Sequence, residues 1–145
     1  MKLNWTRAII AGVAGTLVMT AVGLWIAPLM GIPRMNPADM LAGAMGGNMV
    51  LGWLGHLMIG VMLALIYAVV APRLPGAPPL RGALFSLAPW LMAMVAVMPM
   101  MGMPAFGGAT STAVGSLIGH LVYGATVGSI YGAPAPAGAP HAAHA

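Results

Sequence analysis

The sequence predicts an all-α, polytopic membrane protein with four transmembrane helices. Hydrophobic residues make up 61% of the chain and charged residues 4%, whereas soluble domains carry roughly 25% charged residues to cover their surface. The 145 residues contain four apolar stretches, each close to the roughly 20 residues that cross a bilayer as a helix. Clusters of proline and glycine separate these stretches. We therefore expect lipid, rather than water, to surround most of the chain.

The first predicted span covers residues 5–27, and Pro28 and Pro33 follow it. Proline ends helices because it lacks the amide hydrogen that the next turn needs. The apolar run of this span, residues 8–26, is longer than the roughly 7–15 residues of a signal-peptide core. We therefore expect an uncleaved transmembrane helix.

A short interfacial helix is predicted for residues 37–46. Asn36 is a good N-cap, Pro37 suits the first helical position, and Asp39 can reach back to free amides. The second span then covers residues 49–71, an uncharged run that a single histidine interrupts.

Four prolines and two arginines lie within residues 72–81 and predict a rigid, basic connection. The third span, residues 82–101, contains Pro89 and Pro99, which should kink or shorten it. The fourth span covers residues 110–131.

These spans predict a single transmembrane domain in residues 1–131. The remaining residues, 132–145, are mostly alanine, proline and glycine. Such a segment lacks side chains that could pack, so we expect a disordered tail.

A motif around a histidine occurs twice. Gly55-His56-Leu57-Met58-Ile59-Gly60 returns as Gly119-His120-Leu121-Val122-Tyr123-Gly124, at a constant offset of 64 (120 − 56). The Met-Gly-x-Pro sequence of residues 30–33 also returns at residues 101–104.

The repeat predicts two duplicated helical hairpins, residues 5–71 and 82–131. Each half has an even number of spans, so the halves point the same way and are related by a pseudo-twofold axis along the membrane normal. This axis exchanges the second and fourth spans. If those spans face the bundle axis, His56 and His120 meet across it at one depth.

The two histidines are the candidate site. The positions one helical turn from them, which share their helix face, hold small residues: Gly52, Gly60, Ser116 and Gly124. Two imidazoles on facing helices, with glycines that admit a flat macrocycle, suit a b-type haem.

Two other interpretations of the pair stay open. His56 and His120 could bind a transition metal ion, although two imidazoles leave coordination positions to be filled. Alternatively, the small residues let helices approach closely and each histidine is hydrogen-bonded to a neighbouring helix. Ionisable residues inside membranes are mostly functional, which favours a site.

Methionines gather on the outer side of the predicted bundle. Thioethers bind Cu(I), so a copper relay that ends at the histidines is one interpretation. An adaptable apolar filler is the simpler one. The methionines concerned are Met30, Met35, Met40, Met45, Met49, Met92, Met94, Met98, Met100, Met101 and Met103.

Tyr67 and Tyr131 recur with the repeat, eleven positions after each histidine (67 − 56, 131 − 120). They could form the floor of a cavity beneath the histidines. Anchoring at the membrane interface is the simpler prediction.

Several function classes are excluded or disfavoured by composition. The single acid, Asp39, lies outside the predicted spans, so no nucleophile has both a base and an orienting acid. We therefore predict that the chain is not an enzyme. The five basic residues lie at span ends rather than in a stripe, which argues against nucleic-acid binding. Without cysteine, disulfides and thiolate sites are absent.

The basic residues also predict orientation. Lys2, Arg7, Arg73 and Arg81 fall on one side of the membrane, while Arg34 falls on the other beside Asp39. Positive charge favours the cytoplasmic side, so both termini should be cytoplasmic.

The sequence resembles a family of small bacterial four-helix membrane proteins known only as a domain of unknown function. The resemblance implies a bacterial inner-membrane location and no established activity. The residues that carry it are Asn36-Pro37-Ala38-Asp39-Met40-Leu41, Gly52-Trp53, His56, Gly60, Tyr67, His120, Tyr123-Gly124 and Tyr131-Gly132.

Three functions follow as hypotheses. The first is an accessory subunit of a larger membrane assembly, attached through glycine-rich faces. The second is a protein that holds haem b, or copper, through His56 and His120 for electron transfer or trafficking. The third, a small transporter, is disfavoured by the shortage of intramembrane polar groups.

Overall fold

The computed structural model describes residues 3–132, and throughout that range its regular structure is helical. Apart from Gly132, the predicted tail lies outside the described residues. The four predicted spans are confirmed by stretches long and apolar enough to cross a membrane, so the chain has the architecture of a multi-pass membrane protein. These stretches are Trp5–Met30, Met49–Arg73, Pro78–Met100 and Thr110–Tyr131.

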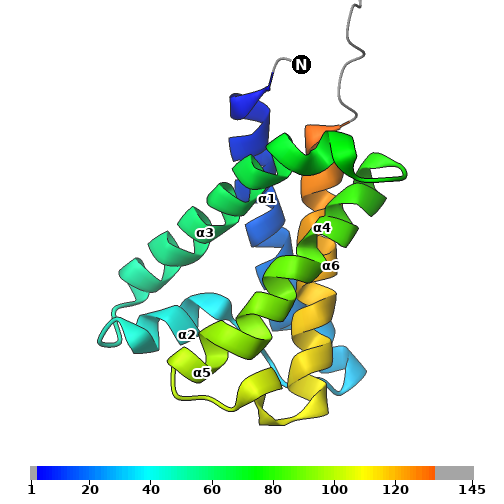
Figure 1. Cartoon of the computed structure of the whole chain (residues 1–145). Coiled ribbons are helices and arrows are strands. Elements are labelled where there is room, and N and C mark those ends of the chain that lie inside the picture. Colours follow the sequence, from blue (N-terminus) through cyan, green and yellow to red (C-terminus); the bar gives the residue numbers. More distant parts are fainter. Residues whose placement is uncertain (1–2, 133–145) are drawn as a thin grey trace, which may run out of the picture.

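Six α-helical segments follow one another along the chain (Figure 1). They are α1 (Trp5–Ala21), α2 (Pro37–Ala44), α3 (Met49–Val70), α4 (Pro78–Met92), α5 (Met98–Met100) and α6 (Thr110–Tyr131).

The short interfacial helix begins where it was predicted. The Asn36 side chain accepts a hydrogen bond from the Ala38 amide at 3.1 Å and donates one to the Asp39 carboxylate at 2.7 Å. The first contact satisfies an amide that the first turn of a helix leaves without a partner, and the second holds the capping side chain in place. The single acid of the chain therefore acts at a helix cap.

The third span begins earlier than predicted. We expected residues 72–81 to form a connection, but α4 begins at Pro78, with Pro78 and Pro79 in its first turn. Proline is tolerated there because first-turn amides need no helical acceptor. Pro89 lies inside α4 without ending it.

The two odd-numbered spans end in the same way. α1 continues into a π-helical segment at Val22–Ile26, and α4 continues into one at Ala93–Val97. After each span, a glycine with positive φ turns the chain: Gly31 at φ 74° and Gly102 at φ 77°. Side chains disfavour this left-handed conformation, which explains glycine at both corners.

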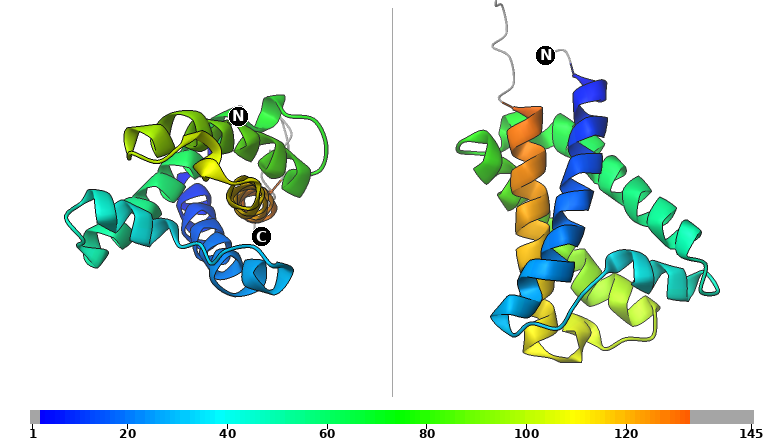
Figure 2. Two further views of the ribbon diagram at one scale, coloured as in Figure 1. Left: turned by 90° about the horizontal axis from the view of Figure 1, so that it is seen from below. Right: turned by 180° about the vertical axis from the view of Figure 1, so that it is seen from behind.

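The helices pack in the order α3, α1, α6, α4. α1 contacts both α3 and α6, α6 also packs on α4, and α2 packs on α3. From its C-terminal end toward its N-terminal end, α3 diverges from the other spans. In Figures 1 and 2, α2 lies beneath the space that this leaves. Among the described residues, α3 and α4 make no extensive contact.

Glycines bring the helices of each hairpin close together. A Cβ on Gly60 of α3 would overlap the Thr16 side chain of α1, and the Gly12 carbonyl is also near. A Cβ on Gly124 of α6 would overlap the Gly82 carbonyl of α4. Such close approach is typical of helix pairs in membranes.

The matching contacts are what a duplicated hairpin would produce, and duplication stays a prediction. The predicted twofold arrangement, however, is wrong for the contacts between halves. A twofold axis would pair an α1–α6 interface with an α4–α3 interface, and only the first is extensive. The divergence of α3 removes its counterpart.

Tyr67 and Tyr131 belong to the core at the end of the bundle where α1 begins and α6 ends. The Tyr67 ring is fully buried and meets the rings of Phe85 and Tyr131 edge to face, at centroid distances of 5.5 and 5.9 Å. The Tyr67 hydroxyl donates to the Pro78 carbonyl at 3.3 Å. Interface anchoring at the lipid surface is therefore wrong for Tyr67, because its hydroxyl finds its partner inside the protein.

Candidate functional site

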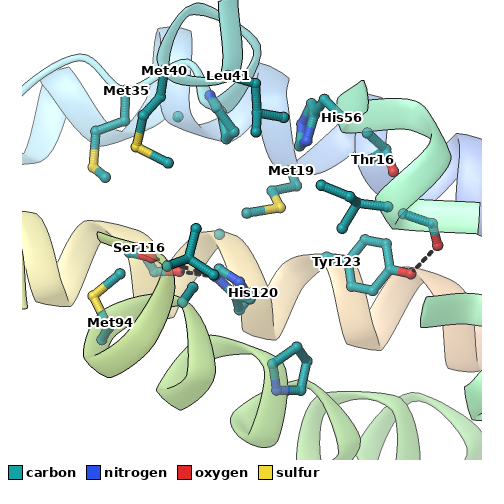
Figure 3. A pocket seen from close by; sticks show the side chains of 18 of the residues that line it. Thr16, Met19, Met35, Met40, Leu41, His56, Met94, Ser116, His120 and Tyr123 are labelled. Carbon is teal, nitrogen blue, oxygen red and sulfur yellow. Dashed lines mark hydrogen bonds between the residues drawn. The ribbon is translucent and has the colours of Figure 1, made fainter. Parts of the chain in front are cut away.

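A cavity of about 430 Å³ lies between the diverging α3 and the helices α1, α4 and α6. Figure 3 shows it from close by. Eight of the 15 methionines of the chain contribute to its wall, including two that the sequence analysis did not single out, Met19 and Met62. The eight are Met19, Met35, Met40, Met62, Met92, Met94, Met98 and Met103.

His56 lies in the cavity wall and is tied to α1. Its Nε2 lies 3.0 Å from the Thr20 hydroxyl, and that hydroxyl donates to the Thr16 carbonyl at 2.8 Å. With the hydroxyl proton donated to the Thr16 carbonyl, Nε2 carries the proton of the His56–Thr20 bond. In an uncharged ring, Nδ1 then holds the lone pair.

His120 lies in the same wall but is tied to its own helix. Its Nδ1 lies 2.8 Å from the Ser116 carbonyl, which can only accept, so Nδ1–H is the donor. An uncharged ring then presents Nε2 as an acceptor. A histidine held by Nδ1–H to a carbonyl is oriented in the way that many metal-ligating histidines are.

The structure places both imidazoles at one cavity, on opposite walls (Figure 3). The thioether of Met19 lies in the space between them in this view. His56 is 7% exposed, and the centroid of its ring lies 6.3 Å from that of Trp53. His56 and His120 therefore line the same cavity, and what they bind stays a prediction.

The four small residues predicted around the histidines do not stay together. Gly60 and Ser116 line the cavity, but Gly52 and Gly124 do not. Gly52 faces α2, where a Cβ would overlap the Ala38 carbonyl, and Gly124 faces α4. These two glycines serve helix packing. Helices that cross at an angle separate along their length, so residues one turn apart meet different neighbours.

Two residues of the site were missed by sequence reasoning: Thr20, which lies behind the cavity wall, and Tyr123, which lines it. The Thr20 hydroxyl is bonded to His56, and the Tyr123 hydroxyl donates to the Gly60 carbonyl at 2.6 Å, which links α6 to α3. Tyr123 occupies the position that Ile59 has in the first copy of the motif, and this difference could have indicated Tyr123 from the sequence. A buried phenol in a membrane needs an acceptor, so such a substitution predicts a contact.

The cavity has a mouth between α3 and α4. Of the residues in its wall, only Ile59, Met62 and Met92 are more than a third exposed, at 38%, 52% and 54%. All three lie near the middle of their spans. The mouth therefore opens toward the hydrocarbon of a bilayer rather than toward water.

The chemistry of the wall is that of a binding site. Within residues 3–132 no cluster of three or more histidines and acids could hold a metal ion. The Thr16 and Tyr123 hydroxyls already donate to backbone carbonyls. The polar capacity that remains in the wall is one imidazole nitrogen on each histidine, together with the side chains of Asn36, Thr112 and Ser116.

The comparisons with known proteins give one match. The family described as "Family of unknown function (DUF6789)" matches residues 3–141. No curated protein and no solved structure matches the chain.

Proposed function

Because the chain belongs to this family of unknown function, we propose its function from the cavity: it binds a small, largely apolar molecule inside the membrane, with His56 and His120 as the polar contacts. The observation that carries this proposal is that the two imidazoles share one apolar cavity while each keeps one nitrogen without a partner in the described chain.

The size and wall of the cavity support a ligand. Its volume of about 430 Å³ falls in the range of roughly 300–1,000 Å³ found for small-molecule sites, which are mostly apolar with a few polar groups. Methionine suits such a wall because its unbranched, polarizable side chain adapts to different shapes.

The unpartnered nitrogens support it as well. Neither is among the fully buried, unbonded side-chain nitrogens of the described chain, which are Arg81 Nε and Trp90 Nε1, and both histidines line the cavity. A ligand that donates to these nitrogens would supply the hydrogen bond that each one lacks within the described chain.

Binding is favoured over catalysis. Ser116 is the hydroxyl nearest to His120, at 3.5 Å from Nδ1, but that Nδ1–H is bonded to the Ser116 carbonyl and cannot act as its base. No carboxylate lines the cavity to orient either imidazole.

Haem or copper ligation is less well supported. Ligation through Nε2 of both histidines would require His56 to give up its bond to Thr20. A metal ion would also have to reach the cavity from water, and the mouth faces hydrocarbon.

A second candidate function is that of an accessory subunit. The unpacked edge between α3 and α4 supports it, since a transmembrane helix of another subunit could lie there. The bacterial inner membrane, with both termini cytoplasmic, remains our proposed location. Arg7, which donates to the Tyr131 carbonyl, and Arg81 mark the end of the bundle that would face the cytoplasm.

Two measurements on protein in lipid nanodiscs test the binding function. An absorption spectrum comes first, and a strong Soret band would replace our proposal with haem binding. Methionine-methyl NMR then follows an added long-chain alkyl probe. Signals from Met19 and Met94 should shift, while Met58 and Met100, which lie outside the cavity and are exposed, should not.

A matched pair of variants locates the binding. Gly119→Leu should fill the cavity and abolish the shifts, because Gly119 lines it and a Cβ there meets only Met19 at 3.4 Å. Gly43→Leu, on the exposed side of α2 with open space around it, should leave them unchanged. Equal shifts at all four methionines would contradict a cavity ligand.

A further inference from the structure

We propose that the ligand is a long-chain molecule with a neutral hydrogen-bond donor at one end, such as a lipid alcohol, and that it enters from the bilayer between α3 and α4. This inference rests on the proposed binding function and deepens it by naming the ligand class and its route.

The route follows from where the wall is exposed. Ile59 and Met62 of α3 and Met92 of α4 are the only exposed residues of the wall, and all lie at mid-span. At the outer end, the linker and α2 close the cavity with Met35, Asn36 and Met40, which are partly covered. A molecule dissolved in the acyl chains therefore meets the mouth directly, whereas a water-soluble one does not.

The head group follows from the hydrogen bonds. His56 uses Nε2–H on Thr20, and His120 uses Nδ1–H on the Ser116 carbonyl. Each ring therefore offers a lone pair and no further proton, so both are acceptors. The complementary head group is a donor, such as a hydroxyl.

A charged head group does not fit. A carboxylate would be a buried charge without a counter-charge, because no lysine or arginine lines the cavity. The Thr16 and Tyr123 hydroxyls are committed to backbone carbonyls, so the remaining donors in the wall are the neutral side chains of Asn36, Thr112 and Ser116. An ammonium would be a buried charge without a carboxylate to pair with it, which is strongly unfavourable in an apolar site.

The tail follows from the shape of the wall. The cavity extends beyond the two histidines along Met35, Met40 and Met94 (Figure 3), so its wall offers apolar surface to a flexible chain. The bare surface of Gly119 beside His120 leaves room for the head group.

A pair of probes, one with a hydroxyl proton and one in which a methyl group replaces it, tests the head group. Methionine-methyl NMR titrations in nanodiscs should compare a long-chain primary alcohol with its methyl ether. The alcohol should bind about fivefold more tightly, since one hydrogen bond contributes about 1 kcal/mol. In His120→Leu this preference should shrink or vanish while the ether still binds.

The outcomes separate the two proposals. If alcohol and ether shift Met19 and Met94 with equal affinity, the donor head group is wrong and cavity binding stands. If neither probe shifts them, the binding function itself fails. This comparison uses the wild-type chain, so it holds even if His120→Leu does not fold. A shift with Ag(I), as a Cu(I) substitute, and none with the alcohol would overturn the ligand class.

The route needs its own variant. Met62→Trp should narrow the mouth and slow association of the alcohol several-fold, with little change in spectra of the apo protein. Met58→Trp, on the lipid-facing side of the same helix at 69% exposure, is the matched control. Equal association rates in the two variants would exclude access between α3 and α4.

Discussion

The α1–α3 hairpin and the α4–α6 hairpin pack in the same way and bond their histidines differently. In the first, Gly60 lies against Gly12 and Thr16; in the second, Gly124 lies against Gly82 and Ser86. The partner positions keep a constant spacing of 70 (82 − 12, 86 − 16). The close contact between helices is therefore shared.

The difference appears one turn further along the odd-numbered helices. Thr20 accepts from His56, but the position 70 residues later holds Trp90 (90 − 20), whose indole can only donate. His120 instead bonds to the Ser116 carbonyl of its own helix. The packing of the two hairpins is thus alike around the His56 and His120 rings. The exchange of Thr20 for Trp90 decides which imidazole nitrogen of each ring stays without a partner.

The largest expected effect tests the shared packing. Gly124→Ala should destabilise the protein by about 3 kcal/mol, because its Cβ would overlap the Gly82 backbone carbonyl. Gly60→Ala should cost less, about 1–2 kcal/mol, since the overlapping group is the Thr16 side chain. Thermal unfolding in detergent, followed by circular dichroism, measures both.

Gly43→Ala is the control for these two variants, because no atom lies within 4 Å of a Cβ there. It should be neutral or slightly stabilising. A Gly60→Ala cost equal to or above that of Gly124→Ala would contradict the distinction between side-chain and backbone overlap.

The next effect tests the difference between the histidines. Thr20→Val should cost about 2 kcal/mol, because it leaves the buried Nε2–H of His56 without an acceptor. Nitrogen NMR of the imidazoles should show an Nε2–H tautomer for His56 and an Nδ1–H tautomer for His120 in the wild type. In the variant only the His56 signals should change, and a change at His120 alone would refute the assignment.

A smaller effect tests the link between the hairpins. Tyr123→Phe removes the hydroxyl that donates to the Gly60 carbonyl at 2.6 Å and should cost about 1 kcal/mol. Thr126→Val is matched to it, since the Thr126 hydroxyl bonds only within its own helix, to the Val122 carbonyl. If unfolding shows equal losses for both variants, the link between α6 and α3 contributes nothing specific.

The smallest effect is expected at Trp90. Its Nε1–H is buried without a partner in the described structure, so Trp90→Phe removes an unsatisfied donor. The stability gained should roughly offset the packing lost with Phe106, whose ring centroid lies 6.1 Å away. The free energy of unfolding should therefore change by no more than about 1 kcal/mol. A loss of several kcal/mol in thermal unfolding would show that the indole nitrogen has a partner.

Hydropathy and helix signals predicted the spans and the start of α2 because they depend on local residues. The Asn36–Asp39 cap and the four apolar stretches were confirmed. The early start at Pro78 was missed because all four prolines of residues 72–81 were assigned to the connection, although proline is also a good first-turn residue, as at Pro37.

The arrangement of the spans could not be predicted in the same way. In a membrane both the core and the lipid are apolar, so periodicity does not distinguish a buried Tyr67 from a lipid-facing side chain. Neighbour order depends on which small residues meet, and that required coordinates. The histidine pair was found because the repeat marks it, while Thr20 was missed because it lies outside the repeated motif.

The π-helical segments have a consequence for how the outer end of the cavity is held. A π turn bonds each carbonyl to the amide five residues later, but for Gly23 that residue is Pro28, which has no amide hydrogen. The Met35 amide donates to the Gly23 carbonyl in its place, at 3.1 Å. This hydrogen bond holds the linker before α2 against the first span. The corresponding pair in the second span is Met94 and Pro99, and no linker amide in the described chain replaces the proline there. One side of the site is thus held by a backbone hydrogen bond from the linker, whereas the corresponding carbonyl of the second span receives no such bond from a linker among the described residues.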